Sequence, residues 1–226
     1  MSFNLYAIGN ALVDSEYLVN DAFLTAQNIQ KGQMTLIDGD QQKSLINALN
    51  QSFSCAKRAS GGSAANSVIA FAAFGGSAFY ACKVANDNNG DFYLQDLRAA
   101  NVSAPQHAQV NEGVTGTCVV MVTPDSERTM HTFLGITAEL SPQELDLTAL
   151  SQAHYLYIEG YLATPTSARH AVSSARALAQ AQGIKTALTF SDPAMVQYAR
   201  TGLVEMLAEG VDILFCNEHE ALLWAN

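Results

Sequence analysis

Residues 153–160, AHYLYIEG, decide the fold because they begin a regular alternation of segments. This apolar run ends at a glycine, and two similar runs follow it: residues 184–190, IKTALTF, and residues 211–216, VDILFC. All three are rich in the aliphatic and aromatic residues typical of strands. Because stretches long enough for a helix separate them, they predict βαβ units with parallel strands.

The stretches between these runs carry helix signals. Thr164 is expected to cap the first helix, with Pro165 as its first residue and Gly183 at its end. A second helix is expected over residues 194–209, and Asn217 opens a third. The alternation therefore extends to the end of the sequence.

The N-terminal half adds further elements and also short β segments outside the alternation. Residues 3–8, FNLYAI, are expected to form a buried strand that ends at Gly9, and residues 63–74 a buried helix. Asp38 or Asp40 can cap a helix that runs to Asn50. The remaining expectations are short β segments at 17–19 and 34–37, a polar loop over 51–60, a strand over 77–84, a helix over 91–100 and a hairpin around PDSER at 124–128.

The expected architecture is one α/β domain over residues 1–226: a doubly wound, mostly parallel sheet flanked by helices. Segments of about 15–37 and 115–135 do not fit the alternation and are expected to form a small β-sheet lid over one edge of it. In open sheets of this type, ligands bind at the carboxyl ends of the strands.

Composition excludes several classes of protein. The 226 residues carry a net charge of −10 and no cluster of lysine and arginine, which argues against binding to nucleic acid. No apolar run approaches the length that spans a membrane, and the N-terminus lacks the pattern of a signal peptide. The four separate cysteines and five histidines form no metal motif. We expect a cytoplasmic protein without a transition-metal site.

Residues 60–76, SGGSAANSVIAFAAFGG, raise the question of a phosphate loop. The stretch lacks the lysine of a GxxxxGK[ST] loop, and the polar residues before it do not predict the strand that a dinucleotide fingerprint requires. What remains is a glycine pair, Gly61 and Gly62, that brings backbone close to another group, with Asn66 in the first turn of a helix. The alternative is a tight turn followed by a capping asparagine.

Polar residues follow the predicted strands where a ligand is expected. An aspartate just past the first strand can accept two hydrogen bonds from sugar hydroxyls, although a turn or cap residue is the alternative. A glutamate at a strand end is favoured as a site residue because burying it without a partner is costly. The candidates of this kind are Asn10, Asp14, Glu159 and Asp192.

Asn217 and Glu220 lie three residues apart in NEHE, at the start of a predicted helix. An amide and a carboxylate at the carboxyl end of a strand suit a hydrated Mg²⁺ that carries a nucleotide phosphate. The alternative is a capping box, in which the two residues satisfy the first turn of the helix.

Together these motifs resemble the ribokinase-like (PfkB) family of carbohydrate and nucleoside kinases. GNALVD, GGSAAN, KVANDNNGDF, TGTCVVMVTPDSERTM, YIEGY, SDP and NEHE occur in the family's order and spacing. RTM followed by FLG, and EGY, look most similar to the bacterial adenosine kinase-like branch.

The resemblance implies a reaction and a set of roles. It implies ATP- and Mg²⁺-dependent phosphorylation of a hydroxyl on a sugar or nucleoside, with an adenosine- or ribose-like acceptor. Lid strands in the family pair between chains, giving a homodimer, or stay within one chain. The residues implied for the acceptor are Asn10, Asp14, Gly61, Gly62, Asn66 and Glu159, and those for nucleotide phosphate are Asp192, Asn217 and Glu220, with Glu220 acting on Mg²⁺ indirectly.

One part of the family's pattern is expected beyond Asn226. The family's glycine-rich GAGD loop carries the base aspartate and follows the NEHE motif by some distance in the chain. The sequence is therefore expected to hold the substrate-binding two thirds of a kinase, with no catalytic residue of its own. A sugar or nucleoside binder without catalysis is the alternative, and a nicotinamide dehydrogenase is a third, weaker reading.

Overall fold

The computed structural model describes residues 2–105 and 112–226, and it confirms the predicted α/β fold. Its main sheet has six strands in the order β11-β10-β9-β1-β5-β6, and every neighbouring pair is parallel. These strands are β1 (Phe3–Ile8), β5 (Ala78–Ala81), β6 (Val102–Ser103), β9 (Ala153–Ile158), β10 (Lys185–Thr189) and β11 (Ile213–Phe215).

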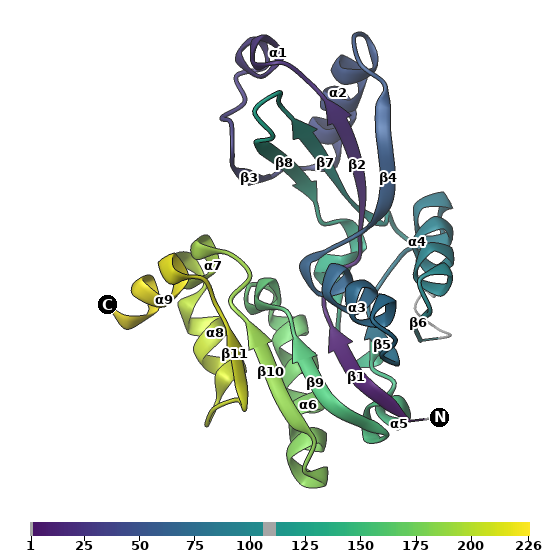
Figure 1. Ribbon diagram of the computed structural model, residues 1–226, viewed down its shortest axis with the longest axis vertical. Coiled ribbons are helices and arrows are strands. Elements are labelled where there is room, and N and C mark those ends of the chain that lie inside the picture. The colour runs from purple at the N-terminus through teal and green to yellow at the C-terminus, as the bar shows by residue number, and fades with distance from the viewer. Residues whose placement is uncertain (1, 106–111) are drawn as a thin grey trace.

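Helices cover both faces of this sheet because strand β1 is apolar on both of its sides. Tyr6 and Ile8 pack into one buried cluster, whereas Ala7 packs into another on the opposite face. Such a strand is typical of the centre of a parallel sheet. Helices α3 (Ser63–Ala73) and α4 (Asn88–Ala99) lie on one face, and α5 (Leu147–Ser151), α6 (Thr166–Gln182) and α8 (Arg200–Leu207) lie on the other (Figure 1).

A second sheet stands beyond the carboxyl edge of the first, at the top of Figure 1. Its five strands run in the order β3-β8-β7-β2-β4. On the outer face of this sheet, Leu45 and Leu49 of helix α2 pack against Val119 and Met121. The strands of this sheet are β2 (Leu12–Leu18), β3 (Met34–Leu36), β4 (Cys55–Gly61), β7 (Gly116–Val122) and β8 (Arg128–Phe133), and the helices between them are α1 (Asp21–Ala26) and α2 (Gly39–Asn50).

The predicted polar loop over residues 51–60 is wrong, because most of it forms strand β4. This strand lies at the edge of the second sheet, where exposed side chains are tolerated, so its polar residues hid it from the pattern. A strand therefore does precede the glycine pair. However, β4 pairs antiparallel with β2 and lies outside the parallel sheet. It thus supplies no βαβ unit of the kind that a dinucleotide fingerprint requires.

Two helix boundaries also differ from the prediction. The single helix expected over 194–209 is two helices, α7 (Pro193–Tyr198) and α8, because the backbone at Ala199 leaves the helical region at φ −116°, ψ 21°. The cap of α6 is Pro165 rather than Thr164, with extended backbone, while Gly183 ends the helix in left-handed conformation as predicted. Of the two candidate caps for α2, Asp38 is the one used, in a complete capping box.

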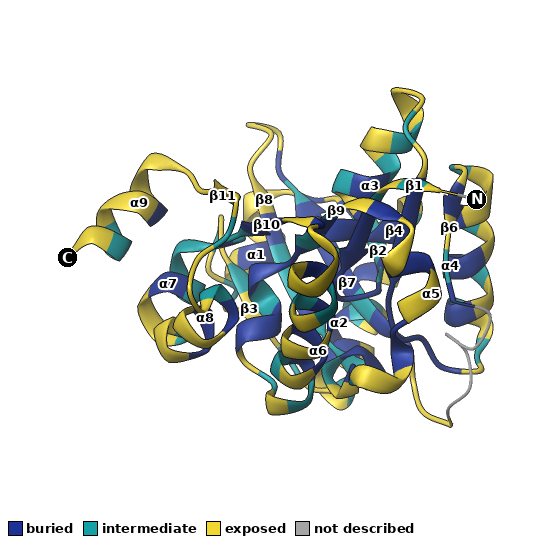
Figure 2. Cartoon of the chain, turned by 90° about the horizontal axis from the view of Figure 1, so that it is seen from below, coloured by how far each residue is buried: buried dark blue, intermediate teal, exposed yellow. Residues whose placement is uncertain are grey.

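Short helical turns connect the sheets and complete the C-terminal end. The turns η1 (Gly135–Glu139) and η2 (Pro142–Glu144) follow β8, and η3 (Gly160–Ala163) follows β9. Helix α9 (Glu218–Ala225) is largely exposed, apart from a few positions that face the protein (Figure 2). Within the described residues, no helix combines the length and apolar character that a membrane crossing requires.

Candidate active site

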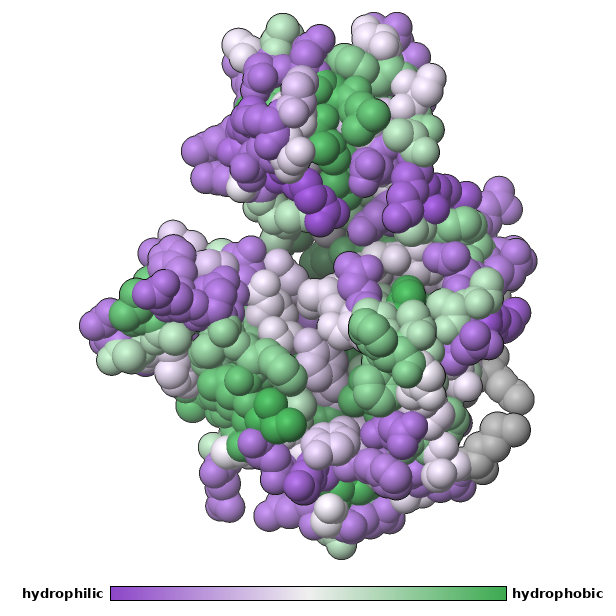
Figure 3. Space-filling view, viewed as in Figure 1, coloured by the Kyte–Doolittle hydropathy of each residue, from purple (hydrophilic) through white to green (hydrophobic). Residues whose placement is uncertain are grey.

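A cavity of about 250 Å³ lies between the two sheets, where the carboxyl ends of β1 and β9 face the inner side of the second sheet. The space-filling view shows the molecule hollowed at this level (Figure 3). Residues from both sheets line the cavity: Asn10, Leu12, Asp14, Met34, Leu36, Gly62, Ser63, Asn66, Cys118, Arg128, Met130, Thr132, Leu134, Glu159, Tyr161, Thr164, Pro165 and Met195. Five of the nine sequence-predicted site residues are in this set.

A larger cavity, of about 540 Å³, lies elsewhere, between α6, α8 and the start of β10. Arg176 crosses it and donates to the main-chain oxygens of Met206 and Gly210, so its guanidinium already holds the end of α8. None of the predicted site residues lines this cavity. We take the smaller cavity as the candidate site because it lies at the carboxyl ends of the parallel strands, where α/β proteins bind ligands.

Asp14 supplies a carboxylate to the cavity. It lies on β2 beside Val13, which is buried in the core, so the alternation of the strand directs Asp14 to the opposite, cavity face. Burial raises the pKa of Asp14 to about 6, and the nearby charges of Arg128 and Lys57 oppose that rise. The half-burial of this carboxylate thus brings its pKa closer to neutral pH.

The glycine pair lets two chain segments approach each other. A side chain on Gly61 would collide with the carboxylate of Asp14, and one on Gly62 would collide with the main-chain oxygen of Asn10. Gly62 also has φ +102°, a conformation that only glycine adopts readily. Both predicted glycines thus adjoin Asp14 and Asn10, although Gly61 itself does not line the cavity.

Asn66 and Asn10 line the same cavity from different elements. Asn66 is exposed in the first turn of α3, with its amide available to a ligand. Asn10 is buried in the turn after β1, and its side-chain oxygen accepts from the hydroxyl of Thr137 at 3.4 Å. Asn66 is thus the more accessible of the two amides.

Glu159 is fully buried at the end of β9 and is occupied by groups of the chain itself. Its Oε1 accepts from the hydroxyl of Ser63 at 2.6 Å and the main-chain N–H of Ala64 at 3.1 Å, and its Oε2 accepts from the N–H of Asn10 at 2.6 Å. Burial raises the pKa of Glu159, and these hydrogen bonds oppose the rise. Helix α3 has Gly62 at its N-cap and no side-chain cap of its own, so Glu159 performs that function from another strand.

Asp192 lies at the margin of the cavity. It caps α7 by accepting from the N–H of Ala194 at 2.7 Å, and its other oxygen accepts from the hydroxyl of Tyr161 at 3.4 Å. Tyr161 lines the cavity, but Asp192 does not. Asp192 therefore lies behind Tyr161 and does not form part of the cavity wall.

Asn217 and Glu220 form the capping box that the sequence left as an alternative. The N–H of Glu220 donates to Asn217 Oδ1 at 2.8 Å, and the N–H of Asn217 donates to Glu220 Oε2 at 3.0 Å. A further bond of 3.2 Å joins Asn217 Nδ2 to Glu220 Oε1. Neither residue lines the cavity, so the structure does not bring this pair together with Asp14.

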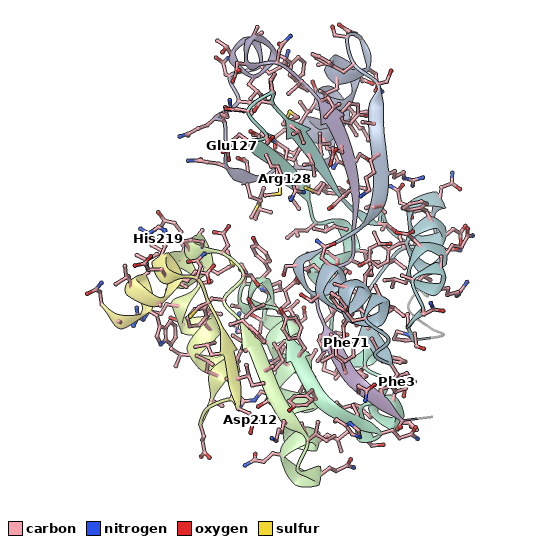
Figure 4. The ribbon with its side chains drawn as sticks, in the orientation of Figure 1. Phe3, Phe71, Glu127, Arg128, Asp212 and His219 are labelled. Atoms are coloured by element: carbon pink, nitrogen blue, oxygen red, sulfur yellow. The ribbon has the colours of Figure 1, made fainter. Side chains whose placement is uncertain are left out.

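Sequence reasoning missed the residues that the second sheet contributes. Arg128, Met130 and Thr132 alternate along β8 and line the cavity together, with Met34 and Leu36 on the neighbouring strand β3. Their period of two in the sequence predicts a shared face, but only the pairing of β3 with β8 shows which face meets the cavity. Figure 4 shows Arg128 beside the space between the sheets, with His219 of α9 on the opposite side.

A parallel α/β sheet with helices on both faces, and a second sheet across its carboxyl edge, define a ribokinase-like fold. The sequence pattern of the pfkB family carbohydrate kinases matches residues 32–226, and the chain belongs to that family.

Relatives of known structure support this placement. The crystal structure of adenosine kinase from Sinorhizobium meliloti is 36% identical with a TM-score of 0.89, and it matches 100% of this chain over 68% of its own. A probable sugar kinase from Rhizobium etli CFN 42 is 34% identical with a TM-score of 0.88 and the same coverage. A ribokinase from Staphylococcus aureus is 24% identical over 203 residues, which are 90% of this chain and 59% of the ribokinase. This chain thus spans about three fifths of that relative's length.

Proposed function

We propose that this chain forms the acceptor-binding part of a kinase that uses ATP and Mg²⁺ to phosphorylate a hydroxyl of a sugar or nucleoside. The observation that carries the proposal is the half-buried carboxylate of Asp14 against the glycine pair, with Asn66 on the same cavity. A carboxylate forms strong, charge-assisted hydrogen bonds, so it is suited to hold two neighbouring hydroxyls. Family membership and the kinases among its relatives support the same reaction class.

Each predicted acceptor residue has a role in this proposal. Asp14 accepts hydrogen bonds from acceptor hydroxyls, and Asn66 both donates to them and accepts from them. Gly62 allows the acceptor close to the main chain and Gly61 leaves room for the Asp14 carboxylate, while Asn10 and Glu159 hold the floor of the cavity. Hydroxyl recognition of this kind rejects analogues that lack the hydroxyl by roughly 10⁴–10⁵.

The cavity favours a nucleoside over a free sugar. Its wall on the second sheet includes an apolar part, formed by Met34, Leu36, Met130 and Leu134, beside Arg128 and Thr132. A free pentose would turn hydroxyls toward this wall and leave them unpaired, which is costly. A nucleobase instead offers an apolar face to the methionine and leucine side chains, so we propose an adenosine-like acceptor ahead of a ribose-like one.

The nucleotide side of the reaction has fewer candidates in this chain. Within the described residues, no group of three or more His, Cys, Asp or Glu side chains could hold a metal ion directly. The Asn217–Glu220 pair fits a hydrated ion better than a bare one, because its polar atoms already bond to each other. When bound, ATP would supply the phosphoryl group and Mg²⁺ would neutralise its charge. We propose Asp192, Asn217 and Glu220 for that side and assign no catalytic base within residues 1–226.

The direct test is acceptor binding by calorimetry with adenosine, ribose and fructose. We expect wild type to bind adenosine most tightly and Asp14→Asn to lose about 10–100-fold in affinity, as for loss of hydrogen bonds to a charged group. Glu16→Gln is the matched control, since Glu16 lies on the same strand outside the cavity. Unchanged affinity in Asp14→Asn would contradict the proposed site.

A second measurement separates the kinase from the alternative, a binder without catalysis. ATP turnover that depends on the acceptor, measured with the full-length gene product, supports the kinase. Acceptor binding without any turnover supports the binder. The oligomeric state follows from sedimentation of the same sample, where a homodimer is one expected form.

A further inference from the structure

Two buried tyrosines contact the segments of residues 10–14 and 61–66, called the acceptor segments, from the side away from the cavity. Tyr80 lies on β5 and Tyr93 on α4, and both are fully buried, with no exposed surface. Neither lines the cavity. They belong to the buried cluster between the sheet and helices α3 and α4, so their rings are packed among apolar residues and their orientation is fixed.

Each hydroxyl bonds to the main chain of one of these segments, and the two hydroxyls also lie close enough to interact with each other. The hydroxyl of Tyr80 donates to the carbonyl oxygen of Asn10 at 2.8 Å, and that of Tyr93 donates to the carbonyl oxygen of Gly61 at 3.0 Å. The Asn10 oxygen is also the atom that a side chain on Gly62 would strike. The two hydroxyls thus act where the turn after β1 and the glycine pair lie against each other.

Both hydroxyls are protonated at neutral pH and can donate. Burial raises the pKa of Tyr80 and of Tyr93 well above the usual value, and the charge of Glu159 adds to the rise for both. Helix α4 makes further bonds to the same point of β4: Asp96 accepts from the N–H of Ser60 at 2.7 Å, and the hydroxyl of Ser60 donates to the Tyr93 carbonyl at 3.3 Å. The end of β4 is thus fixed on several sides.

We propose that Tyr80 and Tyr93 are positioning residues for the acceptor site, each holding through one hydrogen bond the segment that carries the residues in contact with the acceptor. Tyr80 fixes residues 10–14 and therefore Asp14, whereas Tyr93 fixes residues 61–66 and therefore Asn66. Together they set the spacing of the two side chains that would hold neighbouring hydroxyls. This inference rests on the proposed acceptor function of the cavity.

The test removes one hydroxyl at a time with Tyr80→Phe and Tyr93→Phe. Tyr6→Phe is the matched control, because Tyr6 is equally buried and its hydroxyl accepts from the N–H of Asp146, in the core cluster on the other face of the sheet. For all four proteins, adenosine affinity is measured by calorimetry, unfolding by urea, and amide hydrogen exchange by mass spectrometry over residues 10–14 and 61–66.

We expect affinity to fall about tenfold in each of the two variants, the typical effect of one hydrogen bond, and to stay unchanged in Tyr6→Phe at a similar loss of stability. Exchange should rise over 10–14 in Tyr80→Phe and over 61–66 in Tyr93→Phe. Equal losses of affinity in all three variants, or wild-type affinity in Tyr80→Phe and Tyr93→Phe, would overturn the inference.

The two proposals fail in distinguishable ways. If wild type binds none of the acceptors while exchange rises locally as described, the proposed function is wrong and the two tyrosines still hold the segments. If wild type binds adenosine while neither exchange nor affinity changes in the variants, the proposed function stands and the role of the tyrosines is overturned.

Discussion

At the scale of single residues, Asp14 links the chemistry of the site to pH. Burial sets its pKa near 6, above the value of about 3.9 in an unfolded chain. A raised carboxyl pKa means that the contribution of Asp14 to stability is present below the unfolded value and is lost as pH rises through about 6. At neutral pH the unligated protein therefore holds an ionised carboxylate that is poorly solvated. A ligand with two hydroxyls would supply the hydrogen bonds that this carboxylate lacks.

We predict that acceptor affinity falls as pH decreases through about 6, because protonation removes the charged hydrogen-bond acceptor. Below that value the loss should approach tenfold per pH unit, since one proton competes with the ligand. Calorimetry between pH 5 and 8 measures the profile. Asp14→Asn should give a flat profile, and an equally steep profile in that variant would assign the titration to another group such as Glu159.

A second prediction at this scale concerns Gly62. Gly62→Ala should destabilise the protein and weaken acceptor binding, because the new methyl group meets the Asn10 oxygen in addition to straining the backbone. Gly75→Ala is the control, since Gly75 has a similar φ of +91° with nothing within 4 Å of the added atom. Backbone strain alone costs about 1 kcal/mol or more. Gly62→Ala should therefore lower the free energy of unfolding by more than Gly75→Ala does, and the difference is the cost of the collision. Equal unfolding free energies in urea would count against it.

At the scale of elements, the sequence predicted strands and turns better than it predicted their partners. The runs that became β1, β9 and β10 are rich in apolar residues on both faces, so their burial was visible without a structure. The similar run of β11 predicted its strand, but all three of its residues are exposed. Strand β4 was missed because an edge strand tolerates polar residues on both sides. The break between α7 and α8 at Ala199 carries no glycine or proline signal in the sequence.

The candidate site was predictable to a similar degree. The sequence singled out Asp14, Gly62 and Asn66 because they lie near a predicted strand end or at the start of a predicted helix, and the structure places all three on the cavity. The partners of Tyr80 and Tyr93 are main-chain atoms that lie 70 and 32 residues away in sequence, and no local pattern signals such a pairing. The apolar wall of Met34 and Met130 likewise depends on which strands become neighbours.

Two substitutions can distinguish whether Asn217 and Glu220 serve only as the cap of α9 or also act on a hydrated Mg²⁺. Glu220→Gln keeps a side-chain oxygen for the Asn217 N–H, so the box survives, and we predict a small change in stability, within about 0.5 kcal/mol. Asn217→Ala removes the cap and should cost about 1 kcal/mol.

The readout that distinguishes the two is Mg²⁺-dependent binding of ATP to the complete protein, measured alongside unfolding. If the carboxylate acts on a hydrated Mg²⁺, Glu220→Gln weakens that binding although the fold is intact. If nucleotide affinity follows stability alone across both variants, the pair is a helix cap and nothing more.

At the scale of the whole molecule, residues 1–226 leave part of the main sheet exposed. The outer strand β11 exposes Ile213, Leu214 and Phe215, with Phe215 half exposed and in edge-to-face contact with Tyr157. Figure 3 shows an apolar surface over β10 and β11. Unpaired edge strands with apolar side chains associate readily.

We predict that the 226-residue chain self-associates with rising concentration and that Phe215→Lys suppresses this association. Sedimentation velocity measures it, with Leu147→Lys as a control because Leu147 is similarly exposed on α5. Leu36→Lys places a charge on β3, at the edge of the second sheet. Association lost in Leu36→Lys and kept in Phe215→Lys would contradict the prediction and point to pairing through the second sheet.

The way in which the chain enters and leaves the second sheet has a consequence for how such proteins diversify. All of that sheet comes from two continuous stretches, one from β2 to the end of β4 and one from β7 to the end of β8. The groups fixed by Tyr80 and Glu159 lie at the joints, whereas the apolar wall belongs to the stretches themselves. Exchanging both stretches between relatives would replace the ceiling of the cavity while leaving most of its floor in place. Because Asp14 lies on β2, the first stretch would carry the proposed hydroxyl-binding carboxylate together with the apolar wall, whereas Asn10, Asn66 and Glu159 would stay with the main sheet. Such a two-piece exchange would therefore transfer acceptor preference and part of the grip on hydroxyls together.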